Sequence, residues 1–198
     1  MAQNQAAPAA GEVIGMNKVA SPSSLNAVKD EITPIDQFYV RDHFGSQEYR
    51  WRIGDCTLRV EIANRVEFAF SDLLAAPTKK LEALLECAGN KQLLVSHGIW
   101  EGVPMSYLLE QAAPTQDSQQ VMLEGPDAGP LMPGLPSYPF TSNLIPLSKC
   151  LAPETLVAFR LNGQFLPPRN GFPARALLPG WYGMDSIKWL ATNRCFGA

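Results

Sequence analysis

The sequence predicts one domain of the α+β class, and three observations support this prediction. Its 198 residues are 46% hydrophobic and 9% aromatic, which is enough to bury a core. Short runs of alternating apolar residues favour strands, and the segments between them carry helix caps and turn signals. Residues 1–30 are rich in Ala, Asn, Pro and Ser without a period, so we expect a flexible arm at 1–30 and the folded domain at 31–198.

Composition and charge exclude several kinds of partner. The chain has 16 Lys and Arg against 19 Asp and Glu, a net charge of -3, whereas a nucleic-acid binder would show a basic excess. It has no apolar run of about 18 residues, so we expect no membrane span. Residues 1–16 lack the basic and apolar regions of a secretory signal. We therefore expect a cytoplasmic protein if Met1 is the true start, and a periplasmic one if a leader has been removed.

The first elements after the arm are expected to be short. Residues 32–44 mix aromatic and β-branched side chains and end on polar ones, which predicts a strand with a solvated end. Residues 49–62 alternate around a Gly-Asp turn, which predicts short strands. Ser71 as N-cap and Pro77 as a stop predict a short helix between them.

Residues 78–86 fit two patterns. Their leucines fit one face of a helix, whereas Leu81, Ala83, Leu85 and Cys87 fit one side of a strand. Local propensity alone favours the helix. Tertiary context overrides propensity in segments this short, so the choice depends on what surrounds them.

The second half of the chain predicts a helix, an irregular stretch and a hairpin. A proline opens an amphipathic helix over residues 104–112. Residues 113–143 hold many Pro, Gly and Ser residues, which is typical of a solvated linker or of a long irregular loop over a site. Residues 145–151 predict a short helix and 155–161 a strand. An Asn-Gly pair at 162–163 then predicts a type I′ hairpin turn.

Cys87 is the main candidate for chemistry. It is followed by Ala-Gly-Asn, so the thiol is expected at the mouth of a cleft with backbone close by, although a small buried hydrophobe is the alternative. None of Cys56, Cys87, Cys150 and Cys195 belongs to a Cys-x-x-Cys pair, and only two histidines are present. Structural zinc is therefore not expected, while the four cysteines leave three disulfide pairings open.

Several blocks of the chain together resemble the sulfite oxidase family of molybdopterin enzymes. Residues 87–90 are similar to the family's Cys-Ala-Gly-Asn motif, in which the thiolate binds molybdenum. Residues 39–43 resemble Phe-Val-Arg-Asn-His, with Arg41 and His43 matching and Asp42 in the place of Asn. The C-terminal third resembles four further motifs, Asn-Gly-x-x-Leu-Pro, His-Gly-Phe-Pro-x-Arg, Val-Pro-Gly and Val-Lys-Trp-Leu. The resemblance covers about residues 32–190.

This resemblance implies a sulfite-oxidase-type molybdopterin-binding domain with mixed β-sheets and short helices, in which a strand delivers Cys87. It implies a molybdenum-molybdopterin cofactor and an oxidoreductase that transfers one oxygen atom and two electrons to or from a small substrate. An electron-transfer protein, a cytochrome or haem subunit, is then the expected partner. Cys87 would be the metal ligand and catalytic residue, since a soft thiolate suits this metal. Among the cofactor-binding residues, Arg41, Arg175 and Lys188 supply cations for the phosphate. The full cofactor-binding set implied is Tyr39, Val40, Arg41, Asp42, His43, Asn90, Asn170, Gly171, Arg175, Ser186, Ile187 and Lys188.

Several departures from the family pattern bear on the substrate. Asn170 replaces the histidine before Gly-Phe-Pro, and Lys91 and Gln92 stand where sulfite-oxidising members carry arginines. The chain as written also lacks the family's immunoglobulin-like dimerisation domain and its catalytic tyrosine. We therefore expect weak sulfite oxidation and a neutral oxide, such as a sulfoxide or N-oxide, as substrate. The alternatives are a cofactor-retaining binding protein without turnover, and a structural domain in which Cys87 is merely buried.

Overall fold

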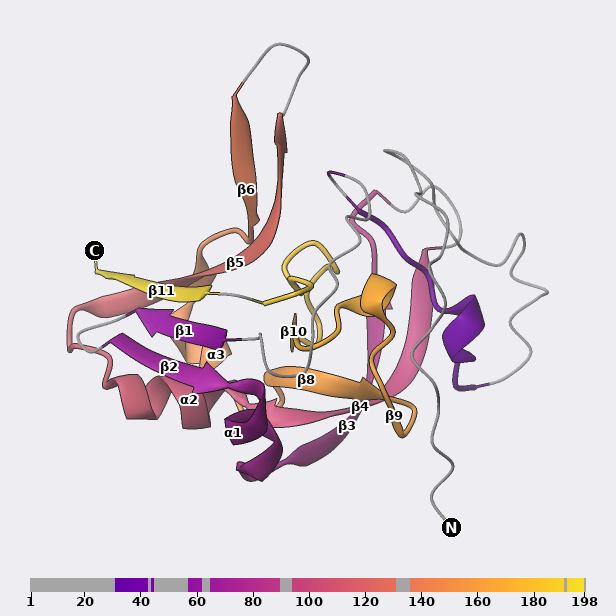
Figure 1. Ribbon diagram of the computed structural model, residues 1–198, viewed down its shortest axis with the longest axis horizontal. Helices are drawn as coiled ribbons and strands as arrows, with labels where there is room; N and C mark the ends of the chain where they lie inside the picture. The colour runs from indigo at the N-terminus through magenta and orange to yellow at the C-terminus, as the bar shows by residue number, and fades with distance from the viewer. Residues whose placement is uncertain are drawn as a thin grey trace.

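The computed structural model describes residues 31–42, 44, 57–61, 65–89, 94–130, 136–190 and 192–197. Within these residues the chain forms two β-sheets with short helices packed against them (Figure 1). The helical elements are η2 (Ile35–Gln37), α1 (Phe70–Ala75), α2 (Met105–Ala112), α3 (Leu147–Cys150) and η3 (Pro168–Asn170). The strands are β1 (Thr57–Glu61), β2 (Arg65–Ala69), β3 (Lys79–Glu86), β4 (Val95–Pro104), β5 (Ser118–Pro130), β6 (Ser137–Thr141), β7 (Ile145–Pro146), β8 (Leu156–Leu161), β9 (Gln164–Phe165), β10 (Arg175–Leu177) and β11 (Thr192–Gly197).

The first sheet joins the first two strands of the described chain to its last strand. Its strand order is β2-β1-β11-β5-β6, with β7 also paired to β5. The β1–β11 pair is parallel and the other pairs are antiparallel, so the sheet is mixed, as the resemblance implied. The far half of β5 and the whole of β6 project from the body as a two-stranded arm (Figure 1).

The second sheet positions Cys87. Its order is β10-β8-β4-β3, with β9 paired to β8, and every pair is antiparallel. Cys87 directly follows β3, and its backbone N–H donates to Leu94 O at 2.9 Å, which extends the β3–β4 pairing by one residue. The expectation of a strand before Cys87 is therefore confirmed. The helix that local propensity favoured does not form, because Ala83 and Leu85 bury one side of β3 against the core.

The core consists of two clusters of buried side chains. One contains residues from α1, α2, β5, β8 and β10, among them the fully buried Leu108 and Leu109. The other lies beneath Cys87 and is built around Trp100, whose ring is fully buried and whose Nε1–H donates to Ala83 O at 3.3 Å. Burying a large apolar side chain contributes about 1.5–3 kcal/mol, so this cluster fixes the end of β3 firmly.

Three expectations for local structure were wrong. Residues 113–143 were expected to be irregular, but β5 and β6 within them pair as an antiparallel hairpin. Val121 and Leu123 alternate into the core, and the register shift between Glu124 and Ala128 accommodates the Gly-Pro pair. Residues 32–44 form no strand, since the only element in their described part is η2, which begins after Pro34.

The cap of α1 also differs from the prediction. Its N-cap is Ala69 rather than Ser71, and the carboxylate of Asp72 accepts a hydrogen bond from Ala69 N at 2.8 Å. The helix therefore begins at Phe70, and the acidic side chain three residues after the N-cap satisfies an N–H that the helix leaves unpaired.

The other local predictions that fall on described residues are confirmed. The helices expected near residues 104–112 and 145–151 are α2 and α3, and the expected strand at 155–161 is β8. Asn162 and Gly163 have φ values of 50° and 80°, as a type I′ turn requires. The arm predicted at 1–30 and residues 49–56 lie outside the described residues, whereas residues 57–61 of the strands expected at 49–62 form β1. No helix in the described part of the chain is long and apolar enough to cross a membrane.

Candidate functional site

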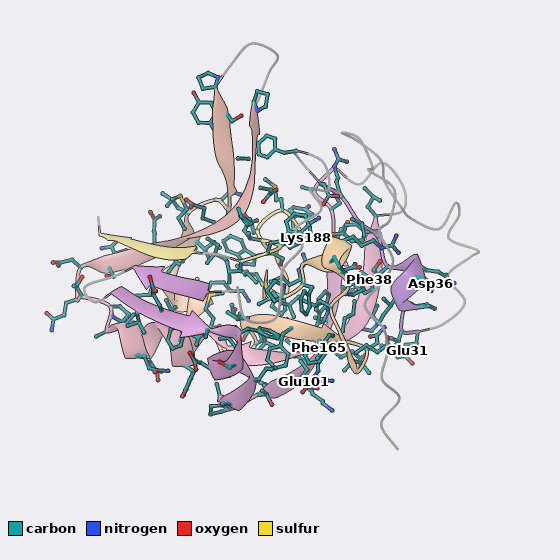
Figure 2. All side chains as sticks on the ribbon, viewed as in Figure 1. Glu31, Asp36, Phe38, Glu101, Phe165 and Lys188 are labelled. Carbon is teal, nitrogen blue, oxygen red and sulfur yellow. The ribbon has the colours of Figure 1, made fainter. Side chains whose placement is uncertain are left out.

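A cavity of about 160 Å³ opens where the end of β3 meets the segment after η2, the turn η3 and the loop before β11. In Figure 2, Lys188 lies near the middle of the view, with Phe38 and then Asp36 to its right. The cavity brings together most of the predicted site: Tyr39, Val40, Arg41, Asp42, Cys87, Asn170, Arg175, Ser186, Ile187 and Lys188. It is also lined by Ala88 and Gly89 of the Cys-Ala-Gly-Asn motif, and by residues that the sequence did not single out as site residues: Leu85, Asp127, Arg169, Gly183 and Met184.

Cys87 lies on the cavity wall with a half-buried thiol. The two residues that follow it are small, so the backbone leaves room beside the sulfur. A Cβ added at Gly89 would lie 4.0 Å from Cys87 Sγ and 3.5 Å from Arg41 Nη1. The thiol and the exposed guanidinium of Arg41 therefore border the same space above Gly89.

Lys188 and Asp42 form an ion pair inside the cavity. Their side chains are 13% and 8% exposed, and Lys188 Nζ also donates to Arg169 O at 3.4 Å and lies 4.2 Å from the Trp189 ring centroid. Burial by itself lowers the pKa of Lys188 to about 7. Contact with the Asp42 carboxylate opposes that shift and favours the charged ammonium.

Arg175 ties two parts of the cavity wall together. Its guanidinium donates to Asn170 O at 3.0 Å and to Ser186 O at 2.7 Å, and it lies 5.4 Å from the Trp100 ring centroid. Burial lowers the pKa of Arg175 to about 10, so the guanidinium remains charged at neutral pH. Arg175 thus holds η3 against the loop that carries Ser186 and Lys188.

Two further buried groups on the wall titrate away from their ordinary values. Tyr39 is 6% exposed, its N–H donates to Ser96 Oγ at 2.9 Å, and burial raises the pKa of its phenol, which therefore stays protonated. Asp127 is 3% exposed, and burial raises the pKa of its carboxyl to about 6. The cavity therefore offers the Tyr39 phenol as a hydrogen-bond donor, and the Asp127 carboxyl as a group that gains or loses a proton near pH 6.

The unsatisfied polar atoms of the described residues gather at this cavity. Buried side-chain nitrogens and oxygens without a hydrogen-bond partner are Asp42 Oδ1, Asp127 Oδ1, Asn170 Nδ2 and Oδ1, and Arg175 Nε. Asp42 Oδ1 has only its ionic contact with Lys188. Leaving such an atom unsatisfied costs about 1–3 kcal/mol, and native proteins rarely tolerate several together. Two carboxylates, an amide and a guanidinium facing one space fit a polar ligand that carries both donors and acceptors.

Among the described residues, Gly171 is the predicted site residue that does not line the cavity. Gly171 lies behind its wall with φ 112°, and a Cβ there would lie 3.0 Å from Arg175 Cβ and 3.3 Å from Lys188 Cα. Glycine therefore allows η3 to approach Lys188 closely. His43 and Asn90 lie outside the described residues.

Asp127 and Arg169 are the charged cavity residues that sequence reasoning missed. Asp127 lies in the Gly-Pro stretch that was interpreted as an irregular loop, although it continues the alternation of Val121 and Leu123 onto the buried face of β5. That alternation was the signal that could have found it. Arg169 directly precedes the matched Asn170, and nothing in the sequence alone places its side chain at the cavity.

Comparisons with known proteins agree with this site. A family model described as oxidoreductase molybdopterin binding domain matches residues 43–194. The chain is 29% identical over 194 residues to an NADH nitrate reductase of Ulva prolifera, covering 87% of this chain and 22% of that protein. It is 30% identical over 181 residues to inducible NADH nitrate reductase 2 of Glycine max, covering 80% of this chain and 20% of that protein.

A solved structure shares the fold as well. The sulfane dehydrogenase SoxCD of Paracoccus pantotrophus superimposes with a TM-score of 0.76 at 27% sequence identity. The match covers 86% of this chain and 45% of that chain. This chain therefore spans about a fifth of the length of the nitrate reductases and less than half of the solved chain.

Proposed function

Because the chain belongs to the oxidoreductase molybdopterin-binding domain family, we propose that it binds the molybdenum cofactor in this cavity and transfers one oxygen atom and two electrons to or from a small substrate. The observation that carries the proposal is the half-buried thiol of Cys87 on the wall of a cavity where the unsatisfied polar atoms gather. A thiolate is a suitable protein ligand for this metal. Molybdenum, when bound, supplies the change of two electrons that accompanies the transfer of one oxygen atom.

The protein residues would divide the binding work according to their chemistry. The Cys87 thiolate would hold the metal. Asp127, Asn170 and the free Nε–H of Arg175 would pair with the donors and acceptors of the pterin, since these atoms have no other partner. Lys188 would supply positive charge for the phosphate of the cofactor. Arg41 would supply positive charge where the substrate binds.

Arg41 favours an anionic substrate over a neutral one. Its guanidinium borders the same space above Gly89 as the Cys87 thiol, so a small oxyanion approaching a metal on that sulfur would meet a fixed positive charge. The neutral oxide expected from the sequence rested in part on Lys91 and Gln92, which lie outside the described residues. Nitrate, for which the similar nitrate reductases are named, is an anion of this kind. We therefore place small oxyanions before neutral oxides as the substrate class.

Turnover also needs a second redox protein or small molecule. Transfer of one oxygen atom is a two-electron reaction, so a donor or acceptor of two electrons would be required in every cycle. An electron-transfer protein of the cytochrome or haem type is therefore the proposed partner.

Replacement of Cys87 tests the proposal directly. The Cys87→Ser variant, produced with molybdenum cofactor supplied, should keep its fold but lose bound molybdenum or its metal absorption bands, because a hydroxyl is a harder and less acidic ligand than a thiol. Cys150→Ala is the matched control, since Cys150 is fully buried in the core away from the cavity. This control should lose some stability yet retain molybdenum. Unchanged metal content and spectrum in Cys87→Ser would contradict the proposal.

A cofactor-retaining protein without turnover is the second candidate function. The chain spans only part of the length of its relatives, so the turnover of those whole proteins is not transferred to it. Steady-state assays with nitrate, sulfite and a sulfoxide, each with a dye as electron donor or acceptor, separate the two. Stoichiometric molybdenum without turnover of any of the three would favour the binding protein.

A further inference from the structure

Fewer positive charges of the cavity are available to a ligand than the number of its cationic side chains indicates. Four cations line it, Arg41, Arg169, Arg175 and Lys188, against the carboxylates of Asp42 and Asp127. Both terminal nitrogens of Arg175 donate to backbone carbonyl oxygens, and Lys188 is in contact with Asp42. The two most buried cations are therefore already engaged before any ligand enters.

The Asp42–Lys188 pair lies where water is scarce. The two side chains are 8% and 13% exposed, the ammonium lies against the Trp189 ring, and its remaining protein acceptor is Arg169 O. An ion pair is screened little in such a place, so the two charges neutralise each other strongly. Asp42 Oδ1 accepts no hydrogen bond besides this contact, which leaves it able to take a donor from a ligand.

An inorganic oxyanion would bind poorly to this arrangement. Sulfate carries no proton to donate, so it would bring its negative charge beside the Asp42 carboxylate without offering that carboxylate a hydrogen bond. It would also have to share the Lys188 ammonium with Asp42. A ligand with N–H donors as well as negative charge offsets both penalties, because its donors can pair with the Asp42 carboxylate and so leave the ammonium of Lys188 more available to its anionic group.

We propose that Asp42 is an internal counterion of Lys188. It makes the part of the cavity around Lys188, in contrast to the space between Arg41 and Cys87, reject small inorganic oxyanions and accept ligands that combine negative charge with hydrogen-bond donors. Asp42 is thus a specificity-determining residue of the cofactor site. The inference deepens the proposed function, since a pterin carries N–H donors and its side chain ends in a phosphate. It also assigns a role to the residue at which this chain departs from the Asn of the resembling motif.

Sulfate binding to the cofactor-free full chain tests this selection. Isothermal titration calorimetry at pH 6 compares the unaltered chain with Asp42→Asn, an isosteric change that removes the counterion. At pH 6 the Lys188 ammonium stays charged even when burial alone sets its pKa near 7. Freeing one charge-assisted partner should tighten sulfate binding about ten- to a hundredfold.

Two further variants isolate the cause. Asp36→Asn removes the same charge from an exposed carboxylate on η2 near the cavity and should leave sulfate affinity unchanged. Asp42→Asn combined with Lys188→Gln should return to the weak binding of the unaltered chain, because the gain requires the freed ammonium. A gain in Asp36→Asn equal to that in Asp42→Asn, or a gain that survives the loss of Lys188, would overturn the proposal.

A measurement on the unaltered protein keeps the proposal testable even if Asp42→Asn fails to fold. The side-chain NMR signal of Lys188, assigned by its loss in Lys188→Gln, should not move when sulfate is added at concentrations that shift the signals of exposed lysines. A large sulfate-induced shift of Lys188 in the unaltered chain would overturn the inference. Because neither measurement needs the cofactor, a chain that never takes up molybdenum would contradict the proposed function without changing these results.

Discussion

The guanidinium of Arg41 and the thiol of Cys87 border one space, in which a Cβ on Gly89 would lie 3.5 Å from Nη1 and 4.0 Å from Sγ. The first prediction concerns this relationship. Arg41→Gln keeps a hydrogen-bond donor but removes the charge, so KM for an anionic substrate such as nitrate should rise about ten- to a hundredfold. Steady-state kinetics of molybdenum-loaded protein measure this change.

A neutral substrate and a second arginine are the controls for Arg41. The KM for a sulfoxide should change little in Arg41→Gln. Arg160→Gln, at a half-buried residue of β8 that does not line the cavity, should leave the KM of both substrates unaffected. An equal rise in KM for the anionic and the neutral substrate would show that Arg41 positions the cofactor and does not discriminate between substrates by their charge.

The second prediction is that Arg175 stabilises the cofactor-free fold. Arg175→Gln should reduce the free energy of unfolding by about 2–5 kcal/mol, because two buried carbonyl oxygens lose charge-assisted donors and the stacking on Trp100 is lost. Urea denaturation followed by tryptophan fluorescence measures the loss.

Arg160→Gln again serves as the control for this change. Arg160 is half-buried, and its longer contacts are to Gly163 O at 3.3 Å and to Glu101 at 4.0 Å. Its replacement should cost less than about 1 kcal/mol. If the two variants lost equal stability, the structural role of Arg175 would be wrong.

The sequence was most informative where a local pattern and a short turn determined the structure. Asn162 and Gly163 can adopt positive φ with little cost, so their hairpin was predictable from two residues. The strand before Cys87 was harder, since its leucines also fit a helix. The motif after it decided the choice, and pairing of β3 with β4 supplies the physical reason.

Long-range contacts were beyond sequence reasoning. Asp42 and Lys188 lie far apart in the chain, and only the meeting of the segment after η2 with the loop before β11 makes them an ion pair. Asp127 was not predicted as a site residue for a different reason. The glycines and prolines around it are typical of loops, yet the bulge in β5 and pairing with β6 make them part of a sheet.

The third prediction concerns pH and Asp127. Burial raises the pKa of this carboxyl from 3.8 to about 6. The folded state therefore binds the Asp127 proton more tightly than the unfolded state does. The stability that this protonation contributes is present below about pH 4 and is lost as pH rises through about 6. About two pKa units correspond to about 3 kcal/mol. The cofactor-free Asp127→Asn variant should lack this loss and gain stability relative to the unaltered chain between pH 4 and pH 7.

Urea denaturation at several pH values tests the Asp127 prediction. The difference in unfolding free energy between Asp127→Asn and the unaltered chain should grow with pH over this window. Asp36→Asn is the control, because Asp36 is exposed and should show no such growth. A difference for Asp127→Asn that stays constant from pH 4 to pH 7 would contradict the prediction.

The fourth prediction concerns Gly183, where the loop before β11 crosses the end of β3. A Cβ at Gly183 would overlap the hydroxyl of Tyr39 and lie 3.2 Å from Glu86 O. Gly183→Ala should therefore destabilise the cofactor-free chain by about 1–3 kcal/mol. Tyr39→Phe removes the overlapping hydroxyl, so in that background the same change should cost at least about 1 kcal/mol less.

Thermal or urea unfolding of the four chains gives this coupling energy, with Gly89→Ala, whose Cβ would make only ordinary contacts, as the control. Equal costs of Gly183→Ala with and without the hydroxyl would show that the Tyr39 phenol does not pack against this loop.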